Sequence, residues 1–576
     1  MSYFTEADKR FLWNFSRSAS FKRELVSLRE TGSILVPPAY EIRPIKIKEV
    51  NWKFYNDHQP GFQWWLNGMK YLRPLLAEGI AQATDIELAA EFIRDWVEKN
   101  PFHEPLAKFA WDGHATAIRA EHLAALYAIG YRNEWLVESI HNHASVLMSD
   151  NFHQGNWNHG LDQDIGLLSL GGALSNNEWI ELARARALFN FESSVDEEGV
   201  SNEQAVGYQY YVFLRFNDLK ERLACCGFPM EESKTKRLHG MLEFCTHAVA
   251  PDGCWSQLGD TLLVKAEDDA TDLLNLAPDS SLVYAVTGGQ KGVEPDATYK
   301  IFKAGFAFGR TAWINEINKA ANYYSLRFGP GRQVHGHNDH MSLTYHHQNE
   351  RVFIDGGFHG YTADFYRDHF RRPEAHNLVI KQGVDRFLWD EPTELLKCDV
   401  FDDYQVYKLR DKPYKEVVRE RCVLFLIKHG VILVLDKVFS KSFSTYYQLW
   451  NLDKSFNVWS VNRESIQLRN SRFSTTIKQL WPYDDLDIFH SSDQPARGWA
   501  GYGRYELHPV PTLSFAKSGK LVTYLTAISV GDVSKEEFIF SQKPIKRHGI
   551  NRLLSVACNN EIFEFLVTED GYFQKK

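Results

Sequence analysis

The sequence predicts an α+β chain of two domains, with helices first and antiparallel strands after them. Up to about residue 295, apolar residues recur at the i, i+3, i+4 spacing of amphipathic helices. Beyond about residue 298, short runs of β-branched and aromatic residues are separated by Gly, Asp, Asn and Lys. We therefore place a helical domain at residues 1–297 and an antiparallel β-sheet domain at residues 298–576.

Residues 84–93 and 118–129 illustrate the helical pattern, and no clear strand interrupts this half. Repeated antiparallel helices of this kind predict an α/α toroid, here an incomplete barrel, or a helical array. No fixed-period repeat indicates a solenoid.

Residues 323–328, 431–435 and 521–525 illustrate the strand pattern. Their spacing predicts antiparallel sheets, most simply stacked as a β-sandwich. The turn-rich stretch Thr287–Gln290 precedes the change from helices to strands.

Composition indicates a globular protein that binds neither nucleic acid nor a membrane. Of the 576 residues, 44% are hydrophobic and 24% are charged, which is typical of globular chains. The net charge of −9 lacks the basic excess that nucleic acid or an acidic membrane surface requires. The longest apolar run, Cys422–Ile427, is too short to span a membrane. An acidic ligand would have to be bound by a local patch of basic residues.

Cysteine usage and the amino terminus bear on the compartment. Seven cysteines without a CxxC pair fit a reducing compartment or buried thiols. The first residues, MSYFTEADKRFLWNFS, show no signal-peptide pattern. We expect a cytoplasmic protein, or a periplasmic or secreted one if a signal has been removed, and a homo-oligomer stays open.

Histidine is concentrated between residues 328 and 377, which hold eight of the chain's 22 histidines. His335 and His337 precede the apolar run Met341–Tyr345, and Asp355 ends the next such run. If the first strand extends back through the histidine pair, its two-residue period places both imidazoles on one face. Two histidines and a carboxylate at strand ends, with a fourth position open, suit zinc or a similar divalent ion. The alternative is that each is a polar residue bonded to backbone or water.

Three stretches of the helical half carry candidate binding groups. The first contains Trp111, which we interpret as a packing residue, and His114 and Arg119, which could line a cleft. The second, residues 156–164, either caps a helix or places an amide beside an imidazole, a pair that can bind a carboxylate. The third, residues 203–211, contains three tyrosines that would ordinarily form an aromatic core stripe.

The order HGHND, an apolar strand, FIDGG, YRDHFRR and AHN, read from residue 335 to 377, resembles the heparinase II/III family of polysaccharide lyases. The resemblance implies an α/α toroid, then antiparallel β-sheets, and a cleft between them. It implies an acidic oligo- or polysaccharide substrate that contains uronic acid, either glycosaminoglycan-like or bacterial, cleaved by β-elimination to a 4,5-unsaturated product. It also implies a structural divalent metal ion, zinc in the first place, with His337, Asp355 and His376 as ligands and His335 left free for chemistry.

In the helical half, the resemblance implies that Asn158 helps to neutralise the uronate carboxyl group, with His159 or Gln163 nearby. It further implies that Tyr208 transfers a proton. Related lyases usually carry His after this tyrosine, whereas this chain has Gln209.

A smaller match, Asp252-Gly253 with Gly259-Asp260, resembles a turn of the family, and we interpret it as structural.

Removing the C5 proton of a uronate requires donors at its carboxyl group, a base at C5 and an acid at the C4 oxygen. We expect Asn158 to supply the donors and Tyr208 to protonate the leaving oxygen. Tyr208 or His335 takes the C5 proton, depending on the configuration at C5. For a tyrosine base, Arg372 or a protonated histidine is expected to lower the pKa.

Three alternatives stay open. A metal-dependent glycan hydrolase would use the same histidines with an activated water. An inverting glycosidase would use Asp162 and Asp164, although two residues so close on a helix diverge in direction. A non-catalytic glycan-binding protein would keep the fold alone. Ultraviolet absorbance of an unsaturated product separates the lyase from these alternatives.

Overall fold

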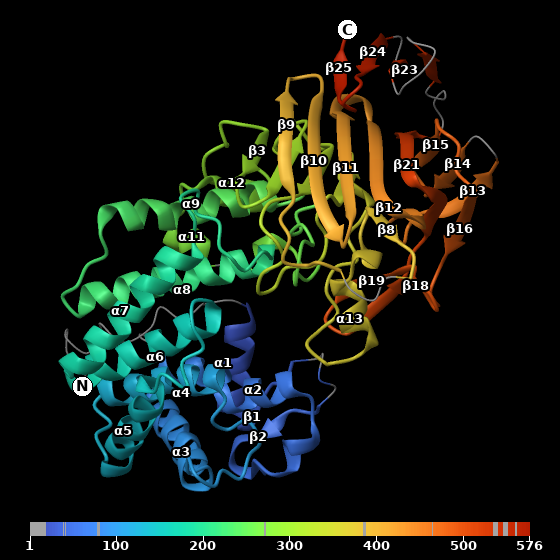
Figure 1. The fold of residues 1–576 in the computed structure, drawn as a ribbon. Coiled ribbons are helices and arrows are strands. Elements are labelled where there is room, and N and C mark those ends of the chain that lie inside the picture. Colours follow the sequence, from blue (N-terminus) through green and yellow to red (C-terminus); the bar gives the residue numbers. More distant parts are fainter. Residues whose placement is uncertain are drawn as a thin grey trace.

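The computed structural model describes residues 19–576, except 38–39, 41, 78–80, 270–271, 384–386, 463–464, 534–538, 545–550 and 559–560. The amino-terminal stretch in which we find no signal-peptide pattern lies outside the described residues. The chain forms a helical part, followed by a part built of β-sheets that packs beside it (Figure 1).

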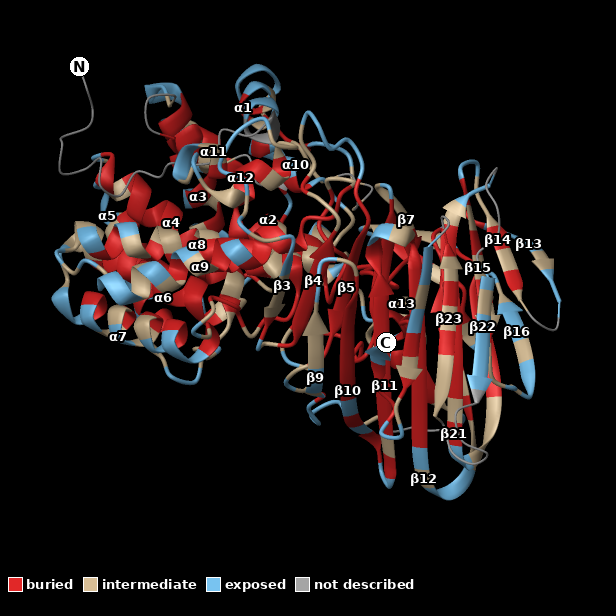
Figure 2. Ribbon diagram, turned by 90° about the horizontal axis from the view of Figure 1, so that it is seen from above, coloured by how far each residue is buried: buried red, intermediate tan, exposed pale blue. Residues whose placement is uncertain are grey.

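The helical part is an α/α toroid of antiparallel helices. Its helices are α1 (Ala19–Thr31), α2 (Pro60–Gly68), α3 (Ala83–Lys99), α4 (Gly113–Ala128), α5 (Glu134–Met148), α6 (Asn158–Leu174), α7 (Asn177–Ser194), α8 (Val206–Cys225), α9 (Glu232–Ala248), α10 (Ala266–Asp269), α11 (Leu273–Leu276) and α12 (Ser281–Val286). Helices α4 and α6 are buried along nearly their whole length, whereas α7 buries one face only (Figure 2). A helix that is buried all round belongs to the interior of the array, and an amphipathic one to its outside.

The sheet part begins with a five-stranded antiparallel sheet in the order β3-β4-β5-β6-β7. Its strands are β3 (Tyr299–Phe302), β4 (Phe306–Arg310), β5 (Tyr323–Arg327), β6 (Leu343–His347) and β7 (Glu350–Phe353). Since α12 ends at Val286 and β3 begins at Tyr299, the change from helices to strands lies between them.

A ten-stranded sheet, called here the large sheet, packs on the first one. Its order is β13-β14-β15-β21-β12-β11-β10-β9, with β16 paired to β21 and β8 to β12, all antiparallel. The strands are β8 (Val379–Lys381), β9 (Glu394–Val400), β10 (Gln405–Tyr414), β11 (Val417–Leu426), β12 (Val431–Asn451), β13 (Asn457–Val461), β14 (Ile466–Arg469), β15 (Phe473–Gln479), β16 (Asp485–Phe489) and β21 (Thr512–Asp532). The two sheets form the expected β-sandwich.

A third layer covers the other face of the large sheet. It is the four-stranded sheet β22 (Ile539–Pro544), β23 (Arg552–Cys558), β24 (Glu561–Val567) and β25 (Phe573–Lys575). Along β11, Val423 and Phe425 belong to the core shared with the five-stranded sheet, whereas Leu424 belongs to the core shared with β23 and β24. This two-residue alternation is why β10, β11 and much of β12 are buried on both faces (Figure 2).

The expectation that the strand of Met341–Tyr345 extends back through His335 and His337 is wrong. Strand β6 begins only at Leu343, and His335 and His337 lie in the preceding loop. Two short hairpins, β17–β18 (Ser492–Asp493, Ala496–Arg497) and β19–β20 (Trp499–Gly503, Glu506–Pro509), and helix α13 (Phe365–Arg371) complete this end of the sheet part. No helix within the described ranges is long and apolar enough to cross a membrane.

Helix α4 has an N-cap that positions one candidate binding residue. The Asp112 carboxylate accepts hydrogen bonds from the backbone N–H of His114 (3.0 Å) and of Ala115 (3.4 Å). We expect Asp112→Ala to lower the free energy of unfolding by about 1 kcal/mol, measured by chemical denaturation. Asp112→Asn should keep most of the stability because Asn is an equally good cap. An equal loss in both variants would contradict capping as the cause.

Candidate active site

Residues from both parts of the chain meet where the first turn of α8 faces the loop before β6. The rings of Tyr208 and His335 are stacked, with centroids 3.6 Å apart and planes inclined by 9°. The Tyr208 hydroxyl is hydrogen-bonded to the hydroxyl of Tyr361, which comes from the segment before α13. Nothing in the sequence singles out Tyr361, because its approach to Tyr208 depends on tertiary structure.

Asp260 holds the two histidines together. This buried carboxylate, from the loop between α9 and α10, accepts hydrogen bonds from His335 Nδ1 and His337 Nε2, each at 3.0 Å, and from Arg367 Nη2 at 2.8 Å. Burial alone would raise the pKa of Asp260, but these bonds outweigh burial and hold the pKa well below its usual value. The turn at Gly259-Asp260, interpreted from sequence as structural, therefore supplies a group of the site.

Gly259 allows the approach of this turn to the histidine loop. It has a φ of +60°, and a Cβ there would lie 2.7 Å from the His335 carbonyl oxygen. Only glycine fits this conformation and this distance.

The start of α6 contributes an amide and an imidazole. The Asn158 backbone N–H donates to Glu203 Oε1 at 2.9 Å, and its buried side-chain oxygen has no hydrogen-bond partner among the described residues. The His159 ring stacks on Trp157, with centroids 4.1 Å apart, and on His114, at 5.1 Å. Burial lowers the pKa of His159 to about 3, so this imidazole is neutral near pH 7.

Glu203 is a buried acid at the edge of this cluster. Its Oε2 lies 3.5 Å from His335 Nε2, and burial raises the pKa of Glu203 to about 7. A carboxyl group with a raised folded-state pKa contributes stability that is complete below its unfolded pKa and is lost as the pH rises through about 7. Thermal unfolding gives the free energy of unfolding of Glu203→Gln and of wild type at each pH. Between pH 5 and pH 8, we expect the value for Glu203→Gln to rise relative to that of wild type by on the order of 2 kcal/mol. A difference that does not vary with pH would contradict burial of the ionised carboxylate.

Two predicted binding residues, Arg119 and Gln163, do not present free groups to this site. The Arg119 guanidinium is fully buried, bonded to His143 Nε2 and the Asn67 carbonyl at 3.0 Å each, and is a packing group. Both ends of the Gln163 amide are bonded to backbone groups of Gln154 and Phe152. These corrections share one reason: helical spacing does not show which face of a helix is covered.

Arg372, expected near Tyr208, does not reach the site either. Its side chain is exposed at the end of α13 and lies 3.7 Å from Asp368. Arg367, on the opposite face of α13, is the arginine that reaches Asp260. The pKa of Tyr208 is not lowered as expected for a base: burial raises it, and the hydrogen bond with Tyr361 offsets this only in part. Tyr208 is therefore protonated near pH 7, as an acid must be.

The acid pair considered for a glycosidase is divided between different partners. Asp162 is bonded to Arg215 Nε at 2.5 Å and lies 3.0 Å from His114 Nδ1. Asp164 instead faces His153 Nε2 at 3.2 Å. The two carboxylates diverge, so they do not flank one glycosidic bond.

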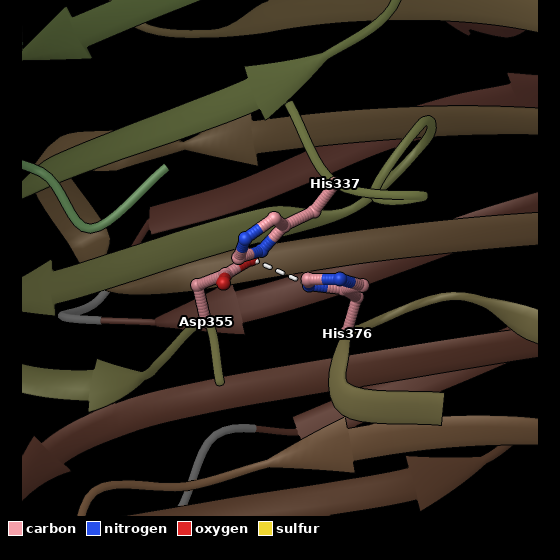
Figure 3. Close-up of side chains that lie close together, drawn as sticks. All are labelled: His337, Asp355 and His376. Atoms are coloured by element: carbon pink, nitrogen blue, oxygen red, sulfur yellow. Dashed lines mark hydrogen bonds and ion pairs between the residues drawn. The ribbon is translucent and has the colours of Figure 1, made fainter. Parts of the chain in front are cut away.

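His337, Asp355 and His376 form a buried cluster with one candidate ligand atom each, all within 4.8 Å of one another (Figure 3). His376 Nδ1 is 2.8 Å from Asp355 Oδ2. His337 Nδ1 and His376 Nε2 are buried without hydrogen-bond partners in the described part of the chain. Unpaired buried imidazole nitrogens beside a carboxylate fit a divalent metal ion such as zinc. The bond from His337 Nε2 to Asp260 supplies the outer carboxylate that metal-binding histidines commonly have.

Family models match both halves of the chain. The model of the heparinase II/III N-terminus matches residues 36–283, and the model of the heparinase II/III-like C-terminal part matches residues 313–531. No curated protein matches the sequence.

Solved lyase structures share the fold at low sequence identity. A crystal structure of heparinase III gives a TM-score of 0.75 at 15% identity, covering 97% of this chain and 91% of that one. Heparan sulfate lyase from Pedobacter heparinus gives 0.69 at 16%, covering 97% and 90%. Chondroitin AC lyase from Streptomyces coelicolor A3, in complex with chondroitin sulphate, gives 0.55 at 12%, covering 97% and 88%.

The two family models cover most of the chain, each in the half whose fold it describes. The chain belongs to the heparinase II/III family of polysaccharide lyases.

Proposed function

We propose that this lyase cleaves acidic oligo- or polysaccharides at a uronic acid by β-elimination, which leaves a 4,5-unsaturated sugar. The stacked pair of Tyr208 and His335 carries the proposal, since it places an acid and a base together. Glu203 links this pair to Asn158, because its two carboxylate oxygens lie against the Asn158 backbone N–H and against His335 Nε2. Family membership supports the same chemistry.

His335 is arranged as the base. Its Nδ1 lies against the ionised Asp260 and is assigned the proton, which leaves Nε2 as the lone-pair nitrogen. Nε2 has no hydrogen-bond partner among the described residues, and Glu203 Oε2 lies 3.5 Å from it, within ion-pair distance once the imidazole is protonated. Asp260 thus orients the imidazole and stabilises the imidazolium formed when Nε2 takes the C5 proton.

Tyr208 is arranged as the acid. Because burial keeps its hydroxyl protonated, it can donate to the C4 oxygen as that bond breaks, and Tyr361 is placed to return a proton to it. Asn158 is proposed to bond the uronate carboxyl group, whose charge grows as the C5 proton leaves. His159, and His114 whose ring stacks on it, are proposed to line the same wall.

A bound zinc ion would supply a fixed positive charge that ties together the segments before β6, after β7 and before β8. His337, Asp355 and His376 are proposed to hold it, and His335 stays available for proton transfer.

We expect purified protein to contain about one zinc ion per chain by elemental analysis. His337→Ala should lose the ion and unfold at a temperature several degrees lower, because metal binding to the folded state stabilises it. His340→Ala is the control, as this neighbouring imidazole is outside the cluster. Metal-free protein with unchanged activity and unfolding temperature after chelation would defeat the metal assignment.

Arginines near the site support an acidic substrate. Arg332 and Arg371 are half-buried, and no ion pair with a carboxylate is found for either among the described residues. Burial lowers the pKa of Arg332 to about 10, and the positive charge of Arg371 adds to this effect. Unpaired guanidinium groups suit carboxylate or sulfate oxygens.

The test is a panel of heparan sulfate, hyaluronan, chondroitin, alginate and bacterial capsular glycans, assayed for a gain in ultraviolet absorbance. At least one uronate-containing glycan should give an absorbing product. Cleavage to saturated products would favour the metal-dependent hydrolase, and binding without cleavage would favour the glycan-binding protein.

A further inference from the structure

A cavity of about 760 Å³ lies on the side of α13 that faces away from the active site. Helix α13, strands β8 and β16 and the β17–β18 hairpin surround it, at the end of the sheet part marked by α13 in Figure 1. Its volume is in the range of small-molecule sites. None of its lining residues is among those proposed above to act on the substrate.

Helix α13 lines the cavity with one face and contacts the candidate active site with the other. Phe365, Asp368, His369 and Arg372 follow the i, i+3, i+4, i+7 spacing of one face, and all four line the cavity. Arg367 lies on the other face and bonds Asp260. A ligand in the cavity would therefore be one helix diameter, about 10 Å, from the Asp260 carboxylate.

Arg497 gives this cavity a buried positive charge without a partner. The residue is 7% exposed, and its Nη1 donates to the Ala496 carbonyl at 2.7 Å. Its Nε is buried with no hydrogen-bond partner, and no carboxylate within the described ranges forms an ion pair with it. Glu374, which also lines the cavity, acts on this charge only from beyond ion-pair distance. A buried guanidinium that no carboxylate bonds directly is costly, and a carboxylate or sulfate group would satisfy it in a bidentate manner.

The rest of the lining suits a sugar ring. Phe365, Tyr447 and Phe489 provide aromatic surface that is exposed or half-buried, on which a pyranose can pack. Around Arg497, two further basic residues, Arg372 and Lys381, are balanced by Asp368, Glu374 and Asp487. The even balance favours one acidic group among hydroxyls over a run of sulfates.

We propose that this cavity is a second saccharide site, separate from the catalytic one, which binds an acidic sugar unit through Arg497 and the aromatic rim. The nature of the ligand rests on the proposed lyase function, whereas the cavity and its unpaired arginine do not.

The test uses full-length protein that carries Asn158→Ala and Tyr208→Phe, so that the catalytic site is disabled. Binding of methyl β-D-glucuronide, glucosamine 6-sulfate and the neutral methyl β-D-glucoside is measured by saturation-transfer NMR. We expect both acidic probes to bind in this background and the neutral probe to bind at least tenfold more weakly. Comparing the two acidic probes distinguishes a carboxylate from a sulfate ligand.

Adding Arg497→Gln should weaken binding of the acidic probes at least tenfold. The rim variant Lys381→Glu should weaken their binding severalfold, and it does so without replacing a fully buried side chain. Arg472→Gln, an exposed arginine paired with Glu350 outside the cavity, should have no effect. Unchanged binding in both Arg497→Gln and Lys381→Glu would overturn the site, as would equal binding of the neutral probe. Turnover of the glycan panel by the native protein is read separately. Its absence on every glycan defeats the lyase, whereas turnover by the native protein together with no probe binding in the disabled background defeats only this site.

Discussion

Replacing Tyr208 by Phe is expected to reduce the appearance of the unsaturated product by between about 10²- and 10⁴-fold. The variant loses only the hydroxyl that would protonate the C4 oxygen. The phenyl ring can keep its stacking on His335, so affinity for the substrate should change little. Turnover is measured by ultraviolet absorbance and affinity by calorimetry.

Two companion variants sharpen this result. Tyr361→Phe should cause a smaller loss of turnover, because Tyr361 contacts the Tyr208 hydroxyl and is not expected to protonate the sugar itself. Tyr366→Phe is the control, since this ring packs on Trp499 beyond the catalytic pair. Full turnover by Tyr208→Phe would remove this tyrosine from the mechanism.

Replacing Asp260 by Asn should have the largest effect on stability. The carboxylate is the shared acceptor for His335, His337 and Arg367, all of them at least half-buried. Removing one member of a buried charge network costs about 3–5 kcal/mol, because the remaining charges lose their compensation. Turnover should be lost as well, since His335 would no longer be oriented as a base.

The pH dependence of this effect has a definite sign. The folded-state pKa of Asp260 is lowered, so its contribution is complete above the unfolded value of about 3.9 and is lost as the pH falls below it. The difference between wild type and Asp260→Asn in chemical denaturation should thus be constant near pH 7 and shrink below about pH 4. Asp252→Asn, from the same loop, should cost much less because its nearest imidazole, His346, is 3.8 Å away. An equal free energy of unfolding for wild type and Asp260→Asn would contradict the role of Asp260 as a shared acceptor that stabilises the fold.

The fold followed from local patterns that tertiary contacts reinforce. Helix α3 carries the 3.6-residue periodicity in its own sequence, and the strands of the sandwich carry β-branched runs. The third layer, β22–β25, was not predicted, since its strands alternate like any exposed hairpin and their target lies elsewhere in the chain.

The candidate site was predicted in part, and for His335 and His337 by an incorrect route. Sequence spacing suggested one face of a strand, whereas Asp260, about 75 residues away, holds the pair within a loop. Arg367 and Arg372 could not be told apart, because both occur in one short basic stretch and only the packing of α13 decides which faces inward. The clustering of His337, Asp355 and His376 was predicted from the resemblance, and the structure brings these three side chains together; their metal stays a prediction.

The proposed acid and base are carried by different folding units, Tyr208 by the toroid and His335 by the sandwich. Neither part alone holds both the acid and the base, so turnover depends on how the two parts are docked. A rotation between the two parts that is too small to alter the secondary structure would separate the Tyr208 phenol from the His335 imidazole and abolish turnover. The proposed proton transfers therefore require the toroid and the sandwich to be docked as they are in this structure.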